Sequence, residues 1–172
     1  MDRRDFLKQL GVLSGSLLIP FSHVFAHEVN ENLKFTPLDK PDSQWRKLVS
    51  ADQFHILFDE GTEPPGSSSL DREKRAGTFI CAACYLPLFE SETKYDSGTG
   101  WPSFYEPITG RVETKLDLKL VWPRTEYHCA RCGGHQGHVF NDGPPPTGKR
   151  YCNNGLALKF IPADQSLPEL RG

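Results

Sequence analysis

The sequence predicts a mainly β domain of antiparallel strands, with a short helical lead-in on its N-terminal side. Its 172 residues include 15 Gly and 14 Pro, and this turn-rich composition leaves little room for long helices. Apolar residues make up 37% of the chain, enough to build one buried core. The β-prone runs are short and turn residues separate them, a pattern typical of antiparallel sheets.

The helical lead-in is expected first. Trp45, Leu48 and Val49 recur at helical spacing and predict a helical segment, with a break, over residues 43–58. Ser43 is the expected N-cap. The segments expected after it are a loop at 61–69 and strands at 78–80, 111–114, 126–128, 138–140 and 156–161.

The N-terminal segment is typical of a cleavable export signal. Arg3, Arg4 and Lys8 precede an apolar stretch, Gly11–Phe21, that is too short to span a bilayer, and Ala26 is the expected cleavage point. The adjacent arginines resemble a twin-arginine signal, which predicts a periplasmic protein. The alternative is an amphipathic helix or an uncleaved anchor. The expected order is a signal over 1–26, a tether over 27–42, a domain over 43–163 and a C-terminal tail over 164–172.

The charge balance excludes several classes of partner. The formal net charge is −2 and the isoelectric point is near 6.3. Neither value favours binding to nucleic acid or to an anionic membrane surface. After signal cleavage we expect no stable membrane insertion, because no other segment is apolar enough to span a bilayer.

Four of the five cysteines form two CxxC pairs, Cys81 with Cys84 and Cys129 with Cys132. Two such pairs can surround one ion, and they predict a closed, structural Zn²⁺ site. Disulfide pairing is the alternative, because an exported protein meets an oxidising environment. A twin-arginine route carries folded cargo, so a metal could be loaded before export.

The fifth cysteine, Cys152, is the candidate nucleophile. On a strand it would share one face with Arg150 and Asn154. A guanidinium beside a thiol favours the reactive thiolate, and Asn can hydrogen-bond a reacting group. The alternative is a free cysteine packed as a small apolar side chain.

Two histidines follow the second CxxC pair. On a strand, His138 would share a face with Phe140 and Asp142. His135 lies three residues earlier, and either imidazole could donate a proton. Surface or metal-adjacent histidines are the alternative. Trp101 ends a glycine-rich turn and could line an apolar pocket, or serve as a core aromatic.

Several long segments together carry a resemblance to a known family. They are GTEPPG, CAACYLPLF, TKYDSGTGWPSF, HCARCGGHQGHVFNDGPPPTGKRYCNN and LALKFIP, in this order, between Trp45 and Pro162. They resemble the B-type methionine-(R)-sulfoxide reductases, which repair oxidised methionine in proteins.

The resemblance implies a fold of two antiparallel β-sheets, with a four-cysteine zinc site remote from the chemistry. It implies that Cys152 is the nucleophile and that the R epimer of methionine sulfoxide is reduced through a sulfenic acid. The polar residues implied around the nucleophile are His135, His138, Asp142, Arg150 and Asn154, and Trp101 is implied to line the methyl pocket beside Phe140.

Three positions depart from the family pattern. Thr99 stands where many members carry a second, resolving cysteine, and Gln136 and Gly155 stand where Leu and Ser are common. With four cysteines assigned to metal, the sulfenic acid requires an external thiol, from a thioredoxin-like or membrane-fed carrier.

Two other function classes compete with this interpretation. A zinc-stapled binding module would not require Cys152 between Arg150 and Asn154. A thiol–disulfide oxidoreductase would need a βαβ context with a helix after its CxxC pair, whereas Tyr-Leu-Pro-Leu-Phe follows Cys84.

Overall fold

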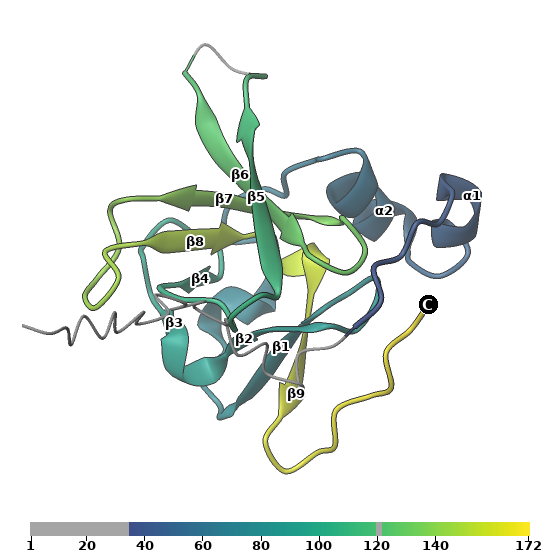
Figure 1. The fold of residues 1–172 in the computed structure, drawn as a ribbon. Coiled ribbons are helices and arrows are strands. Elements are labelled where there is room, and N and C mark those ends of the chain that lie inside the picture. The colour runs from purple at the N-terminus through teal and green to yellow at the C-terminus, as the bar shows by residue number, and fades with distance from the viewer. Residues whose placement is uncertain (1–34, 120–121) are drawn as a thin grey trace, which may run out of the picture. The chain divides into compact units, whose positions relative to one another are not determined.

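Two antiparallel β-sheets form the framework of residues 35–119 and 122–172, which are the residues that the computed structural model describes (Figure 1). The predicted export signal lies outside the described residues. The three-stranded sheet has the order β2 (Pro87–Glu90), β1 (Gly77–Cys81), β9 (Leu158–Pro162). The six-stranded sheet has the order β3 (Lys94–Tyr95), β4 (Ser103–Phe104), β8 (Arg150–Asn153), β7 (His135–Phe140), β6 (Arg124–Cys129), β5 (Val112–Asp117). The predicted fold class, mainly β with two antiparallel sheets, is confirmed.

The helical lead-in consists of two helices, α1 (Asp42–Trp45) and α2 (Ala51–Phe58). The N-cap of α1 is Pro41 and Ser43 lies inside the helix, so the predicted cap was wrong. Ser50 is instead the N-cap of α2, and its hydroxyl accepts a hydrogen bond from the Gln53 N–H in a reciprocal capping box.

Buried aromatic rings join the two sheets. Phe89 of β2 stacks on Phe104 of β4, with ring centroids 4.2 Å apart, and Phe79 of β1 meets the same ring edge-on at 4.9 Å. Tyr127 of β6 contacts Phe89 from the other side. All four side chains are fully buried, and each contributes about 1.5–3 kcal/mol through burial. This core holds the sheets that carry the candidate site residues.

The expected strand at 156–161 differs from the structure at its start. A short 3₁₀ helix, η4 (Gly155–Ala157), comes first, and β9 begins at Leu158. The Glu63 carboxylate accepts hydrogen bonds from the N–H groups of Gly155 and Leu156, so these donors do not enter the sheet. Two further 3₁₀ helices, η2 (Ser69–Arg72) and η3 (Ser91–Thr93), lie in connections.

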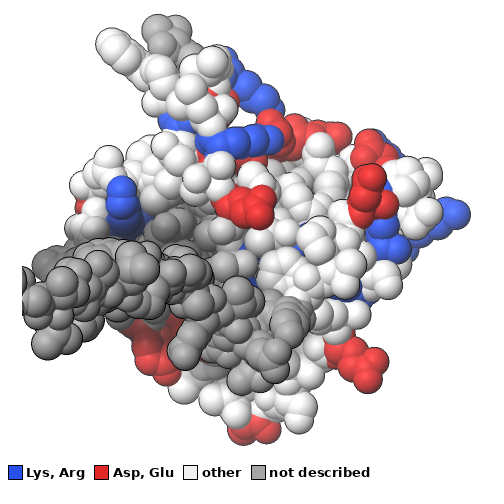
Figure 2. Space-filling model, in the orientation of Figure 1, with Lys and Arg blue, Asp and Glu red and all other residues white. Residues whose placement is uncertain are grey.

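The surface carries charges of both signs. On the face shown in Figure 2, described Lys and Arg side chains lie beside Asp and Glu side chains. Among the helices of residues 35–119 and 122–172, none has the length and apolar character needed to cross a bilayer.

Candidate active site and metal site

The two CxxC pairs converge on one buried cluster. Cys81 ends β1 and Cys129 ends β6, and each partner cysteine follows in the adjoining turn. The four sulfur atoms all lie within 4.8 Å of one another, with Sγ–Sγ distances of 3.7 Å for Cys81–Cys132 and 3.5 Å for Cys84–Cys129.

These distances fit a metal site. Four sulfurs at about 2.3 Å from a central Zn²⁺ would lie about 3.8 Å apart at the corners of a tetrahedron. A disulfide requires about 2.05 Å between sulfurs. All five cysteines are free, which contradicts the disulfide alternative. The cluster is therefore able to bind one metal ion, with every position filled by protein.

Cys152 opens into a separate cavity of about 250 Å³. It is half-buried on β8 and lies directly opposite His138 of β7 in the sheet register. The cavity gathers all of the predicted catalytic and substrate-binding residues except His135 and Asp142, namely Trp101, His138, Phe140, Arg150, Cys152 and Asn154. A larger cavity at Asp71–Arg75 has charged walls without cysteine or histidine.

The two predicted residues outside the cavity lining each contact a residue that lines it. Asp142 forms a two-pronged ion pair with Arg150, with N–O distances of 2.9 and 2.8 Å, and its own side chain is 61% exposed. His135 is buried, and its ring centroid lies 5.4 Å from that of His138. The structure thus places His138, rather than His135, at the cavity with Cys152.

Burial dominates the electrostatics of Cys152. Burial raises the pKa of its thiol above the ordinary value, while the charge of Arg150 and hydrogen bonds with Thr99 and Arg150 lower it. Arg150 does favour the thiolate, as the sequence predicted, but its effect is smaller than that of burial. Burial therefore favours the thiol form of Cys152.

Glu63, which is distant in sequence from the cavity residues that it contacts, holds part of the cavity wall in place. The Glu63 carbonyl accepts a hydrogen bond from Trp101 Nε1 at 3.0 Å, and the Glu63 N–H donates to Asn154 Oδ1 at 3.0 Å. The Glu63 carboxylate binds the turn after Asn154. One buried residue therefore fixes the positions of two cavity side chains.

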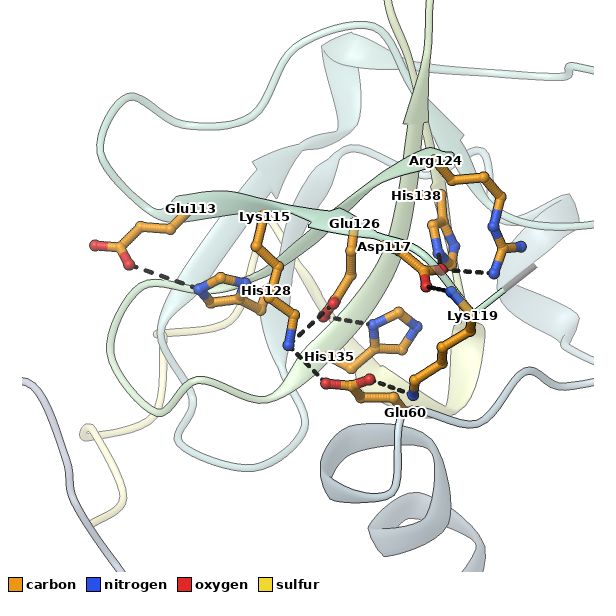
Figure 3. Close-up of polar contacts among 10 residues, drawn as sticks. All are labelled: Glu60, Glu113, Lys115, Asp117, Lys119, Arg124, Glu126, His128, His135 and His138. Atoms are coloured by element: carbon orange, nitrogen blue, oxygen red, sulfur yellow. Dashed lines mark hydrogen bonds and ion pairs between the residues drawn. The ribbon is translucent and has the colours of Figure 1, made fainter. Parts of the chain in front are cut away.

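Two carboxylate–histidine pairs lie close together on the six-stranded sheet, and His138 of one pair lines the cavity (Figure 3). His138 Nε2 lies 2.8 Å from Asp117 Oδ2, and His135 Nδ1 lies 2.9 Å from Glu126 Oε1. Burial lowers the pKa of both imidazoles, and the carboxylates oppose that shift. Arg124, which pairs with Asp117, also lines the cavity.

Sequence reasoning missed Asp117, Arg124, Glu63 and Glu126. Asp117 and Glu63 act through partners distant in the chain, His138 and Asn154, while Arg124 lines the cavity itself and Glu126 contacts His135. Strand alternation offered one signal, because Asp117 and Arg124 are register partners at the end of the β5–β6 hairpin where the connecting loop joins the two strands. Their shared face could have been inferred once that hairpin was known.

Comparison with known proteins gives a consistent result. Residues 49–162 match the model of the SelR domain. The chain is 49% identical over 124 residues to a peptide methionine sulfoxide reductase MsrB of Methanosarcina barkeri, covering 72% of this chain and 87% of the relative. It is 49% identical over 124 residues to the same-named protein of Leptospira interrogans, covering 72% and 95%. Identity is 51% over 120 residues to the chloroplastic peptide methionine sulfoxide reductase B1 of Oryza sativa, covering 69% and 56%.

Removal of the metal tests the cysteine cluster. Purified protein should hold one metal ion per chain, and Cys81→Ser should lower both the metal content and the melting temperature, because a closed site contributes folding free energy directly. Elemental analysis and thermal melts measure the two effects. Cys152→Ser is the matched control and should keep its metal. An unchanged melting temperature after chelation would contradict a structural role.

Proposed function

Because the chain belongs to the SelR-domain family of peptide methionine sulfoxide reductases, we propose that it reduces the R epimer of methionine sulfoxide in proteins and peptides, with Cys152 as its nucleophile. The observation that carries this proposal is the cavity that joins Cys152 to His138 and Trp101. Cys152 is the one cysteine of the five that lies outside the metal cluster. A binding module would have no use for this combination of thiol, imidazole and aromatic wall.

The chemistry follows from these groups. Cys152 attacks the sulfoxide sulfur as a thiolate, and the departing oxygen must be protonated because an oxyanion leaves poorly. His138 can take the thiol proton and deliver it to that oxygen. The exchange balances without another reactant: the thiol and the sulfoxide become a sulfenic acid and methionine, and the oxygen and the proton both end on Cys152.

The cavity walls suit the two ends of the substrate group. The Trp101 indole provides an apolar face on which a methyl group packs, and its Nε1 is occupied by the Glu63 carbonyl. Arg124, Arg150 and Asn154 supply polar groups on other walls. Fixed positions for methyl and oxygen would select one epimer at sulfur.

Regeneration requires an external thiol. Thr99 lines the cavity where a resolving cysteine would be expected, and the other four cysteines are buried in the metal cluster. An incoming thiolate therefore attacks the Cys152 sulfur and forms a mixed disulfide, which a second thiol resolves. A dithiol or a redox carrier performs both steps.

The metal in this proposal is Zn²⁺. Four thiolates in a closed tetrahedron suit this ion, and such a site offers no open position for substrate. Zn²⁺ would contribute structural stability, by holding the ends of β1 and β6 together.

We also propose that the protein is exported to the periplasm through its twin-arginine signal. The sequence of residues 1–26 supports this location. The bulk environment there is oxidising, so the reductant must come from a dedicated thiol carrier, such as a membrane-fed one.

Loss of the nucleophile tests the reaction. Cys152→Ser removes the thiol with little change in volume, so we expect a folded protein that turns over no substrate. Chiral chromatography of a blocked methionine sulfoxide measures each epimer. Wild-type protein should consume only the R epimer. Undiminished reduction by Cys152→Ser would reject the assignment.

Thiol counting tests the single-cysteine cycle. One equivalent of substrate, without reductant, should yield one equivalent of methionine and a sulfenic acid trappable at Cys152. Free thiols titrated in the denatured, metal-free product should fall by one per chain, because Thr99 cannot form a disulfide. Loss of two thiols would show that a metal-ligand cysteine had formed a disulfide with Cys152, which would overturn both the cycle and the purely structural metal.

A further inference from the structure

Asp117 is a buried carboxylate at the end of β5, beside the cavity but not in its lining. Its Oδ1 accepts a hydrogen bond from the Lys119 N–H at 2.9 Å. Its Oδ2 lies 2.7 Å from Arg124 Nη2 and 2.8 Å from His138 Nε2 (Figure 3). Both of these partners line the cavity that holds Cys152.

The charge state of Asp117 fixes where the His138 proton lies. The hydrogen bonds from Lys119 and His138, with that from Arg124, hold the pKa of Asp117 far below its ordinary value. An ionised carboxylate can only accept hydrogen bonds. Neutral His138 must therefore carry its proton on Nε2, which leaves the lone pair on Nδ1.

The neighbouring pair is built differently. Here the carboxylate of Glu126 is hydrogen-bonded to the Nδ1 atom of His135 rather than to its Nε2 atom. The same carboxylate forms an ion pair with Lys115 at 3.1 Å. His135 Nε2 is buried without a hydrogen-bond partner among the described residues, and His135 does not line the cavity. Of the two pairs, the one formed by Asp117 serves Cys152.

We propose that Asp117 is a positioning residue, which holds His138 as the Nε2–H tautomer so that Nδ1 exchanges the proton with Cys152 and the sulfoxide oxygen, and which anchors Arg124 at the same cavity. This inference rests on the proposed reductase function. The charged and titratable groups that face His138 are Asp117 from β5, Arg124 from β6, His135 from β7 and Cys152 from β8.

Asp117→Asn tests the proposal, with Glu113→Gln as the matched control. Glu113 is also on β5 and faces a histidine, His128, but lies outside the cavity. We expect Asp117→Asn to slow single-turnover methionine formation by at least about tenfold, in the range seen when carboxylates that orient imidazoles are removed, with substrate affinity changed less than about twofold. Glu113→Gln should react like the wild type.

Nitrogen-15 NMR of His138 gives a readout that a purely structural role would not move. Wild-type protein should show the Nε2–H tautomer, and Asp117→Asn should show a mixture. The negative charge of Asp117 raises the pKa of His138, so its removal should lower that pKa and move the rate–pH profile to lower pH.

Three results would overturn the inference. The first is an Nδ1–H tautomer of His138 in the wild-type protein, a result that needs no variant. The second is a wild-type single-turnover rate in Asp117→Asn. The third is an equal loss of single-turnover rate in Asp117→Asn and Glu113→Gln. Failure of the reductase function itself would appear separately, as wild-type protein that forms no methionine from the R epimer of methionine sulfoxide.

A second observation concerns the metal cluster and is independent of catalysis. Arg171, outside the part of the chain that matches the SelR domain, binds three successive residues of the first CxxC turn. Its Nη2 donates to the Ala82 carbonyl at 2.6 Å, its Nε to the Ala83 carbonyl at 2.7 Å, and its N–H to the Cys84 carbonyl at 3.0 Å.

Arg131 links this turn to the second one. It lies between Cys129 and Cys132, and its Nη1 donates to the carbonyls of Cys84 at 3.1 Å and Arg171 at 2.6 Å. Four thiolates around one divalent ion leave a formal charge of about −2, which two adjacent guanidinium groups would balance. Release of the ion requires the turns to separate, and these bonds oppose that separation.

We infer that Arg171 locks the metal site and slows the escape of its ion. The test loads the protein with Zn²⁺ and follows release to a chelating dye by absorbance. We expect Arg171→Ala to release Zn²⁺ about tenfold faster or more, on the scale of other groups that support metal ligands, and Arg171→Lys to lie between it and the wild type, because Lys keeps the charge but not the planar fork.

Arg75→Ala is the control, because Arg75 is an exposed arginine paired with Glu73. It should release Zn²⁺ at the wild-type rate. Release from Arg171→Ala at the wild-type rate would overturn the inference. If Arg171→Ala does not fold, Arg171→Lys replaces it in the comparison. Release of Zn²⁺ from Arg171→Lys at the wild-type rate would then overturn the inference.

Discussion

The close approach of β7 and β8 is the constraint on which the candidate active site depends. A Cβ at Gly137 would lie 1.9 Å from the Cys152 carbonyl oxygen, so only glycine allows the strands to pair here. The resulting register sets His138 against Cys152 and Phe140 against Arg150. Because side chains alternate along a strand, a slip of one residue would send these groups to opposite faces.

The metal cluster provides a second connection between the two sheets. It connects the end of β1 in one sheet with the end of β6 in the other, while the aromatic core joins the sheets elsewhere. Gln136, the residue before Gly137, links the two sites. Its side-chain Nε2 lies 3.6 Å from Cys81 Sγ, and its carbonyl accepts hydrogen bonds from the backbone and side chain of Asn154. A polar residue at a position where the family commonly has Leu thus joins metal site and cavity.

Local patterns predicted the fold class and much of the cavity, and tertiary contacts account for what was missed. The period of two along a strand predicted that Arg150 and Cys152 share a face, and CxxC spacing predicted the cluster. Nothing local marks Glu63 as the residue that positions Asn154, because the two are joined only by the fold. The start of the strand predicted from Leu156 failed for the same reason, since the Glu63 carboxylate binds its N–H.

Burial moves the pKa values of Cys152 and His138, the pair proposed to react, in opposite directions. Desolvation raises the pKa of Cys152 and lowers that of His138, so both favour their neutral forms. A neutral thiol is a poor target for general oxidants, because the thiolate is the reactive form. In the proposed reaction, proton transfer from Cys152 to His138 would create an ion pair, and its cost falls when polar groups of the cavity and of the substrate face it. A bound sulfoxide would then supply part of the stabilisation of the proposed nucleophile, and Arg150, held in place by its ion pair with Asp142, would supply positive charge at the same cavity.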